Sequence, residues 1–351
     1  MEVNIYKTNK MEKKYLLALI ISAFCLFSFS AMAAVEDSTV VITFNGSSAS
    51  VEKASNVSQY VTVTTDGAHV TLTQSDDVST TTCGEITYIL TGSSTNGSLT
   101  LVGNFKATLS LQDLTLTNPN GPAINIQNGK RIKISVKRET INNLTDGESS
   151  LLDAWKGALQ CKGHTEFKGY GTLNVTGKYA HAIWSKEYVT IKNCTINILS
   201  AVKDGLNCNQ YFSMESGTLN ISDYGDDGIQ VGLKTNDTSA ENTGNFTITG
   251  GTININTTGS TGSSIKAEGT ITKSGGTINE IASALEEIEK KDGDEGNYSL
   301  NSGNSSGISV YSAIGTYIGT FSTLDEAGQS LPHSIYIIRA AGKSPVKATL
   351  P

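Results

Sequence analysis

A five-residue phrase returns along this chain at nearly even spacing, and it constrains the fold more than any other feature. The phrase reads Gly-Thr-Leu-Asn-Val at 171–175, and variants of it begin at Cys194, Gly217, Gly251 and Gly276. The threonines of these phrases follow one another at steps of 23, 23, 34 and 25 residues. A period in this range is typical of a stacked repeat architecture rather than of a globular domain.

A second phrase, a small residue followed by Ile or Leu, keeps the same period. Its copies are Ala123-Ile124, Ala158-Leu159, Ala182-Ile183, Gly205-Leu206, Gly228-Ile229 and Ser264-Ile265. Both phrases lie in segments that alternate apolar and polar residues and are rich in Thr, Ile, Val and Gly, which indicates strands and excludes helical repeats. We therefore predict an all-β fold, a parallel β-helix with about 23 residues per coil. The crossover rule for parallel strands predicts that this helix is right-handed.

The recurring phrase also predicts which of its side chains are buried. Because side chains alternate along a strand, Leu and Val point into the coil while Thr and Asn point outward. The outward residues stack in two columns, Thr172, Thr195, Thr218 and Thr252 in one and Asn174, Asn197, Asn220 and Asn254 in the other. Such columns hydrogen-bond along the stack, which favours a structural role. A flat Thr/Asn surface that binds sugar or ice is the alternative interpretation.

Two steps are longer than one coil and mark insertions. The step of 34 contains Val231 to Glu241, and the step of 35 between Ala123 and Ala158 contains Asn142 to Trp155. Insertions in solenoids gather on one face, often the functional one, so we predict that the two border one groove.

The first residues have the composition of a secretory signal. Lys13 and Lys14 precede an apolar stretch at 15–29, and Ala31-Met32-Ala33 supplies a small-residue cleavage site. Because of this signal we expect a secreted or cell-surface protein. No later segment is apolar enough to span a bilayer. The predicted divisions are a signal peptide at 1–33, the β-helix at 34–282, a charged and Gly/Ser/Asn-rich linker at 283–307, and a small C-terminal β domain at 308–351.

Charge and cysteine content restrict the partners and the covalent chemistry. The chain carries a formal net charge of −7, which argues against a nucleic acid partner because phosphate binding needs a basic surface. Four cysteines follow the predicted cleavage site, namely Cys83, Cys161, Cys194 and Cys208. In the coil register Cys161 and Cys208 lie two coils apart, roughly 9–10 Å between Cα atoms, which is beyond disulfide reach. We expect reduced, mostly buried cysteines.

The residue before each small-Ile phrase forms a further column, which contains the main candidate site. Its members are Gly157, His181, Asp204, Asp227 and Ser263. Asp204 and Asp227 are neighbours in it, about 5 Å apart at Cα, and Asp226 adjoins them. Clustered carboxylates on a turn suit Ca²⁺, so we predict Asp204, Asp226 and Asp227 as metal ligands. Asp-Gly also makes a tight turn, which is a structural role compatible with the metal.

Three cations and two rings are the candidate ligands of a saccharide. The alternating strand at 130–137 points its isoleucines inward, so Arg131, Lys133 and Lys137 line up outward as a basic stripe that can contact the carboxylates of an acidic polysaccharide. Trp184 follows an inward isoleucine and is expected to face outward, where its ring can stack on a sugar. His181 completes the predicted ligand-binding set. A solvated face and local loop packing are the structural alternatives.

An ordered set of motifs resembles a known family. The motifs are Gly-Tyr-Gly-Thr-Leu-Asn-Val-Thr-Gly-Lys-Tyr at 169–179, His181-Ala182-Ile183, Asp204-Gly205-Leu206 and Asp227-Gly228-Ile229. They resemble the bacterial secreted carbohydrate-binding β-helix proteins with a pectate-lyase-like fold, of the polygalacturonate-binding type. The resemblance implies binding of an acidic plant polysaccharide, such as polygalacturonate, with bound calcium and no demonstrated lyase activity. The tail from Ile308 resembles the C-terminal sorting domains of type IX secretion, which implies anchoring at the cell envelope.

We therefore expect a non-catalytic carbohydrate-binding protein with an acidic polysaccharide as partner and Ca²⁺ as cofactor. Two other classes of function fit the sequence. A polysaccharide lyase acting on uronate polymers needs a Lys or Arg base beside the calcium site, and Lys203 is the candidate there. A cell-surface adhesin or scaffold would bind host or matrix partners instead of sugar.

Overall fold

The computed structural model describes residues 36–148, 155–256, 261–281, 308–312, 317–332, 334–340 and 346–350. The predicted signal peptide at 1–33 and the predicted linker at 283–307 lie outside these residues. Among the helices that are described, none has the length and apolar character needed to cross a membrane.

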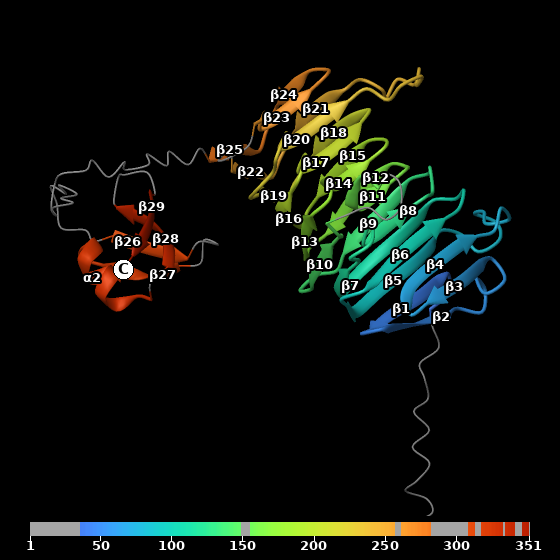
Figure 1. Cartoon of the computed structure of the whole chain (residues 1–351). Coiled ribbons are helices and arrows are strands. Elements are labelled where there is room, and N and C mark those ends of the chain that lie inside the picture. Colours follow the sequence, from blue (N-terminus) through green and yellow to red (C-terminus); the bar gives the residue numbers. More distant parts are fainter. Residues whose placement is uncertain are drawn as a thin grey trace, which may run out of the picture. The chain divides into compact units, whose positions relative to one another are not determined.

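Two large sheets of mostly parallel strands form the chain from Thr39 to Ile281 (Figure 1), as expected for a nearly all-β, solenoid-like fold. The smaller, sheet B, has nine strands. These are β3 (Val61–Asp66), β4 (Ala68–Gln74), β6 (Gly97–Val102), β8 (Ile124–Ile126), β11 (Gly157–Cys161), β14 (His181–Ser185), β17 (Leu206–Asn209), β20 (Ile229–Gly232) and β23 (Ile265–Ala267).

The larger, sheet A, has sixteen strands in two arms that meet at the long strand β7 (Ala107–Thr117). The first arm is β9 (Ile132–Val136), β12 (Thr165–Gly169), β15 (Val189–Lys192), β18 (Tyr211–Met214), β21 (Asn245–Ile248) and β24 (Ile271–Lys273). The second arm is β10 (Ile141–Thr145), β13 (Thr172–Gly177), β16 (Thr195–Ala201), β19 (Thr218–Ile221), β22 (Thr252–Asn256) and β25 (Thr277–Ile281). The remaining strands are β1 (Thr39–Asn45), β2 (Ser48–Lys53) and β5 (Ile86–Ser94).

Each regular coil contributes three strands, one to sheet B and one to each arm of sheet A, as β11, β12 and β13 do. Neighbouring coils pair in parallel, and Thr172, Thr195 and Thr218 are partners along the second arm. The same column continues to Thr252 and Thr277, across the longer steps. Positions that are equivalent in the repeat therefore lie side by side in space, while the handedness of the helix stays a prediction.

The outward asparagines of the second arm form a hydrogen-bonded ladder, as predicted. Each side-chain amide donates to the carbonyl oxygen of the asparagine one coil earlier, at 2.7–2.8 Å, through Asn143, Asn174, Asn197, Asn220, Asn254 and Asn279. On the inward face of these strands, Leu173, Ile196 and Leu219 are fully buried. The recurring phrase thus has a structural role: its apolar side chains fill the interior of the coil, and its outward asparagines hydrogen-bond to one another.

Glycine begins most copies of the phrase because the corner before it needs a left-handed backbone. Gly217 has φ 92°, and a Cβ atom there would lie 2.4 Å from the carbonyl oxygen of Cys194. Where Cys194 replaces the glycine, Asn193 takes the left-handed conformation instead, with φ 68°. Asparagine tolerates that region better than most residues.

The two insertions lie at different corners of the coil, one after and one before a strand of sheet B, and that they border one groove stays a prediction. The segment Val231–Glu241 begins within β20 and continues towards β21, at the corner between sheet B and the first arm. The other insertion follows β10, at the corner between the second arm and sheet B, and its residues 149–154 lie outside the described part. The repeat period counts residues per coil but does not indicate which of the three corners received the extra ones.

All four described cysteines are free and buried. Ser185 pairs with Cys161 on one side and with Cys208 on the other, so these two thiols lie two coils apart, as the register predicted. Burial raises the pKa of Cys161 to about 11 and that of Cys194 to about 12, which keeps both thiols protonated and unreactive at neutral pH.

The described residues after 307 form a separate antiparallel sheet in the order β27-β26-β28-β29. Its strands are β26 (Ile308–Ser312), β27 (Tyr317–Phe321), β28 (Ser334–Ala340) and β29 (Val346–Leu350), and the segment also contains a short helix, α2 (Leu324–Ser330). The hydroxyl of Thr323 caps the helix by accepting a hydrogen bond from the Glu326 amide. This helix was not predicted, and the sorting role of the segment stays a prediction.

Candidate functional site

A column of polar side chains stands at the corner that leads into sheet B, one residue per coil. The carboxylate Oδ1 of Asp204 accepts a hydrogen bond from the backbone N–H of Asp227, at 3.1 Å. Asp227 Oδ1 in turn accepts one from the N–H of Ser263, at 2.8 Å. Nδ1 of His181 lies 3.2 Å from the backbone nitrogen of Asp204 and 3.2 Å from its Oδ2. Asp204 and Asp227 each satisfy a backbone donor of the next coil, which is the structural role expected for such turns. His181 Nδ1 either accepts the Asp204 N–H or, when it carries a proton, donates to Asp204 Oδ2.

The predicted acidic cluster is assembled at this column. Asp204, Asp226 and Asp227 each offer a carboxylate oxygen, and the three oxygens lie within 4.8 Å of one another. Asp204 and Asp227 are buried, and Asp226 is exposed. Among the described residues, the Asp226 carboxylate has no hydrogen-bond or ion-pair partner. Its oxygens are therefore available to a ligand from solvent.

Asp204 is held in its charged form. Burial raises the pKa of its carboxyl, but hydrogen bonds from His181, from the Asn207 amide at 2.7 Å and from the Asp227 N–H outweigh burial and lower the pKa. Three carboxylates at this separation form an oxygen-rich, negatively charged set that fits a hard divalent cation such as Ca²⁺.

Lys266 is the functional neighbour that the sequence reasoning missed. Its Nζ lies 3.0 Å from Oδ2 of Asp227, and it is half-exposed. It occupies, one coil later, the position that Asn207 and Gln230 hold in sheet B. Lys266 follows Ser263 of the column by three residues, just as Asn207 follows Asp204, so the repeat could have placed Lys266 beside the acidic column. A cation that uses Asp227 Oδ2 has to displace this ammonium group.

The predicted basic stripe faces outward, but its charges are largely paired. Arg131 forms ion pairs with Glu85 and, at 3.7 Å, with Glu166, while Lys133 lies 3.8 Å from Glu85. Lys137 donates to the side-chain oxygen of Gln112 at 2.9 Å. The stripe is therefore not the unpaired positive surface that the sequence suggested. The partner carboxylates come from other coils, so the local pattern around Lys130 did not reveal them.

The aromatic side chains are less accessible to a sugar ring than predicted. Trp184 faces outward but is half-buried, and Nζ of Lys156 lies 4.9 Å from its ring centroid, in a cation–π contact. Trp155 is buried, packs against Tyr179 at 4.5 Å, and donates its Nε1–H to Asp146 at 3.0 Å. Trp155 and Tyr179 thus follow the loop-packing alternative, and a sugar-stacking role for Trp184 stays a prediction.

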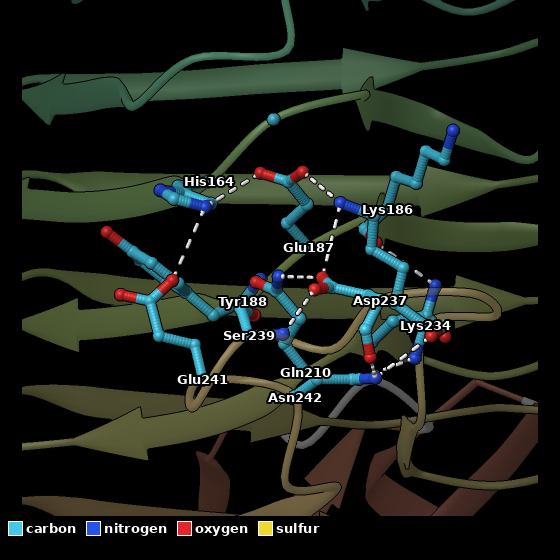
Figure 2. Close-up of polar contacts among 12 residues, drawn as sticks. His164, Lys186, Glu187, Tyr188, Gln210, Lys234, Asp237, Ser239, Glu241 and Asn242 are labelled. Carbon is cyan, nitrogen blue, oxygen red and sulfur yellow. Dashed lines mark hydrogen bonds and ion pairs between the residues drawn. The ribbon is translucent and has the colours of Figure 1, made fainter.

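A second polar cluster, which the sequence reasoning did not identify, holds the insertion after β20 against the first arm (Figure 2). His164, Tyr188 and Tyr211 stack on successive coils, with ring centroids 4.1 and 4.6 Å apart. Glu187 lies between His164, at 2.8 Å, and Lys234 of the insertion. Burial raises the pKa of the Glu187 carboxyl, but these two partners outweigh burial and lower it.

The same insertion is closed by amide hydrogen bonds. Gln210 donates to Asp237 Oδ2 at 2.7 Å, and the Asn242 amide donates to the carbonyl oxygens of Lys234 and Asp237. Most side chains of this cluster are paired with one another, and we assign it a structural role; Glu187 Oε2 lies 2.8 Å from His164 Nε2 but makes no well-aligned hydrogen bond among the described residues. Its ladder of rings, just before or at the start of the strands of the first arm, was the sequence signal that could have revealed it.

The fold and site together define a solenoid of parallel strands with an acidic cluster at one corner. The chain belongs to the family of carbohydrate-binding domain-containing proteins, whose model matches residues 66–316. Its structure is similar to that of the polysaccharide lyase-like protein from C. thermocellum, solved as a gadolinium derivative, with a TM-score of 0.51 and 20% identity. The match covers 70% of this chain and 98% of the other, and it supports the fold. No curated protein matches the sequence.

Proposed function

We propose that this protein is a secreted or cell-surface, non-catalytic binder of acidic polysaccharide, of the polygalacturonate type, and that Ca²⁺ assists the binding. The observation that carries the proposal is the acidic cluster, with three carboxylate oxygens within 4.8 Å in a chain of a carbohydrate-binding family. A protein of net charge −7 needs positive charge to hold a polyanion. A cation bound between its own carboxylates and those of the sugar supplies that charge.

Asp204, Asp226 and Asp227 would hold the cation. Asp226 is exposed, so its carboxylate can turn towards an ion or a ligand without breaking a contact of the fold. Asp204 and Asp227 are fixed by the backbone amides that they accept, which preorganises one wall of the site. Lys266 balances part of the negative charge when no cation is bound.

Lys266, the lysine that contacts the cluster, suits binding better than β-elimination. Lys203, the base candidate of the lyase alternative, is exposed and directly precedes Asp204, and a lyase that used it would release an unsaturated product. A lyase needs a neutral amine or guanidine as base beside the sugar carbon that loses its proton. The hydrogen bond and charge of Asp227 raise the pKa of Lys266, so this amine stays protonated at neutral pH. A protonated lysine can bind a uronate carboxylate, but it is a poor base.

The proposal is tested with Asp226→Asn, because this side chain has no structural partner among the described residues. Calorimetric titration with Ca²⁺, and then with oligogalacturonate in the presence of Ca²⁺, should show at least tenfold weaker binding than the wild type. Asp66→Asn, an equally exposed change at the end of β3, is the matched control and should bind as the wild type does. Equal binding by both variants would remove the cluster from the proposal. Release of an unsaturated uronate product, followed by ultraviolet absorbance, would show a lyase instead.

A further inference from the structure

A groove of about 480 Å³ lies at the corner between the second arm of sheet A and sheet B, on the turns that lead to the acidic cluster. Three successive coils form it through Lys178, Val202 and Tyr224 and their neighbours, and Glu148 stands at its side. The groove is shallow and open to solvent, so it would contact one face of a ligand rather than enclose it.

Small residues form the turns beneath the groove. Gly177 and Gly225 line it together with Ala201. A Cβ atom on Gly225 would lie 2.2 Å from the carbonyl oxygen of Val202, so the turns are stacked as closely as glycine allows.

Two aliphatic side chains are exposed at this corner. Val202 lines the groove with 56% of its surface exposed. Leu199, three residues earlier, is 48% exposed and is the extra residue of a β-bulge, where Val175 pairs with Ile198 and Thr176 with Ser200. Bulges often re-aim the chain beside a functional site. An exposed aliphatic patch of this kind suits the C–H face of a pyranose ring.

Charged groups surround the apolar patch. Nζ of Lys178 lies 3.2 Å from Glu148, and both side chains are well exposed, so this pair is weak and exchangeable. Asp223 is exposed on the opposite turn. An ammonium group binds a sugar carboxylate, and carboxylates accept hydrogen bonds from sugar hydroxyls.

The groove and the acidic cluster share the same two turns. Tyr224 and Gly225 directly precede Asp226 and Asp227, and Val202 and Lys203 directly precede Asp204. The amides of Gly225 and Asp226 both donate to the carbonyl oxygen of Lys203, at 3.0 and 3.3 Å, which ties the turns together. A saccharide in the groove would therefore have its next unit close to the cluster.

We propose that this groove is a saccharide subsite that takes one uronate ring, with Val202 against the ring face and Lys178 at its carboxylate. The inference rests on the proposed function, since it locates the sugar beside the cluster that binds the cation. It assigns a role to a corner that the basic stripe, on the first arm, does not reach.

The test compares two exposed valines. Val202→Asp places a negative charge in the groove and should weaken trigalacturonate binding, measured by calorimetry with Ca²⁺ present, at least tenfold. Val102→Asp is the matched control, because Val102 is also exposed, at 36%, but lies at the end of β6 in sheet B. It should bind as the wild type does. Lys178→Gln is a second variant that leaves the fold contacts of the valine intact, and it should weaken binding of trigalacturonate but not of galactotriose, its neutral counterpart.

Each outcome decides between the two proposals. If Val202→Asp and Lys178→Gln bind trigalacturonate like the wild type while Asp226→Asn does not, the groove is not the subsite, and the proposed function stands. If the wild type binds galactotriose better than trigalacturonate and Val202→Asp abolishes this, the uronate assignment is overturned and so is the acidic ligand. If the wild type binds neither trisaccharide, the groove inference and the proposed function are both overturned.

Discussion

Lys266 Nζ lies 3.0 Å from Asp227 Oδ2, so an ammonium group of one coil neutralises a buried carboxylate of the preceding coil. This contact places a built-in cation where the proposed Ca²⁺ would bind. The two cations compete for the same oxygen, and their competition sets the affinity of the site for metal.

Lys266→Met is therefore expected to tighten Ca²⁺ binding about five- to tenfold, because it removes the competitor and its charge repulsion. Calorimetric titration with Ca²⁺ measures this directly. Lys273→Met, on the neighbouring strand β24, changes the net charge equally and is the control for a long-range effect. Equal gains in both variants, or weaker binding by Lys266→Met, would contradict direct competition.

Glu187→Gln should loosen the insertion after β20. The carboxylate is shared by His164 and Lys234, and a hydrogen bond to a charged group contributes about 1.5–3 kcal/mol. Hydrogen exchange at the amides of 232–241 should accelerate by the corresponding factor at pH 7. Unchanged exchange there would mean that Gln210 and Asn242 hold the loop without the ion pairs.

The effect of Glu187 should also depend on pH in a defined direction. The folded-state pKa of Glu187 is lowered. Its contribution to the stability of the insertion is therefore complete above the unfolded-state pKa of about 4.3, and it is lost as the pH falls through the lower folded-state pKa. The difference in exchange between wild type and Glu187→Gln should therefore shrink as the pH is lowered below about 4. A difference that grows on acidification would require another titrating group.

The asparagine ladder offers an internal comparison of interior and terminal members. Asn197 donates to Asn174 and accepts from Asn220, whereas Asn279 has only the donated bond to Asn254 among the described residues. Asn197→Ala should lower the free energy of unfolding by about 1–3 kcal/mol, and Asn279→Ala by about half as much. Denaturant titration of both variants measures this ratio. Equal losses would indicate that the ladder does not act bond by bond.

Tyr224→Phe should be neutral or stabilising by about 1 kcal/mol. The Tyr224 ring is buried, and its hydroxyl has no hydrogen-bond partner in the part of the chain that the structure describes. Removing a buried, unsatisfied polar atom avoids its desolvation penalty. A rise in the thermal unfolding temperature is the expected result, and a clear fall would reveal a partner for this hydroxyl, such as a bound water molecule.

The repeat predicted which residues lie side by side on neighbouring coils, but not the contacts that long side chains make between coils. Parallel pairing copies position from coil to coil, so the threonine period alone placed Asp204 beside Asp227 and turned the asparagines outward. Long side chains cross coils, and the partners of Arg131 and Asp227 therefore came from residues that the phrase does not contain. The β-bulge at Leu199, just before the groove residues Ser200 to Val202, was not predicted, because alternation along a strand does not reveal an extra residue.

Binding of the full-length protein to a glycan array, in calcium buffer and again with a chelator, tests the central claim most directly. The account predicts signals on uronate polymers such as polygalacturonate, weak or no signals on neutral glucans, and loss of the uronate signals in chelator. Uronate binding that persists in chelator would contradict the role of calcium. An array without any glycan signal, in a protein that still binds host or matrix proteins, would contradict the account as a whole and indicate an adhesin.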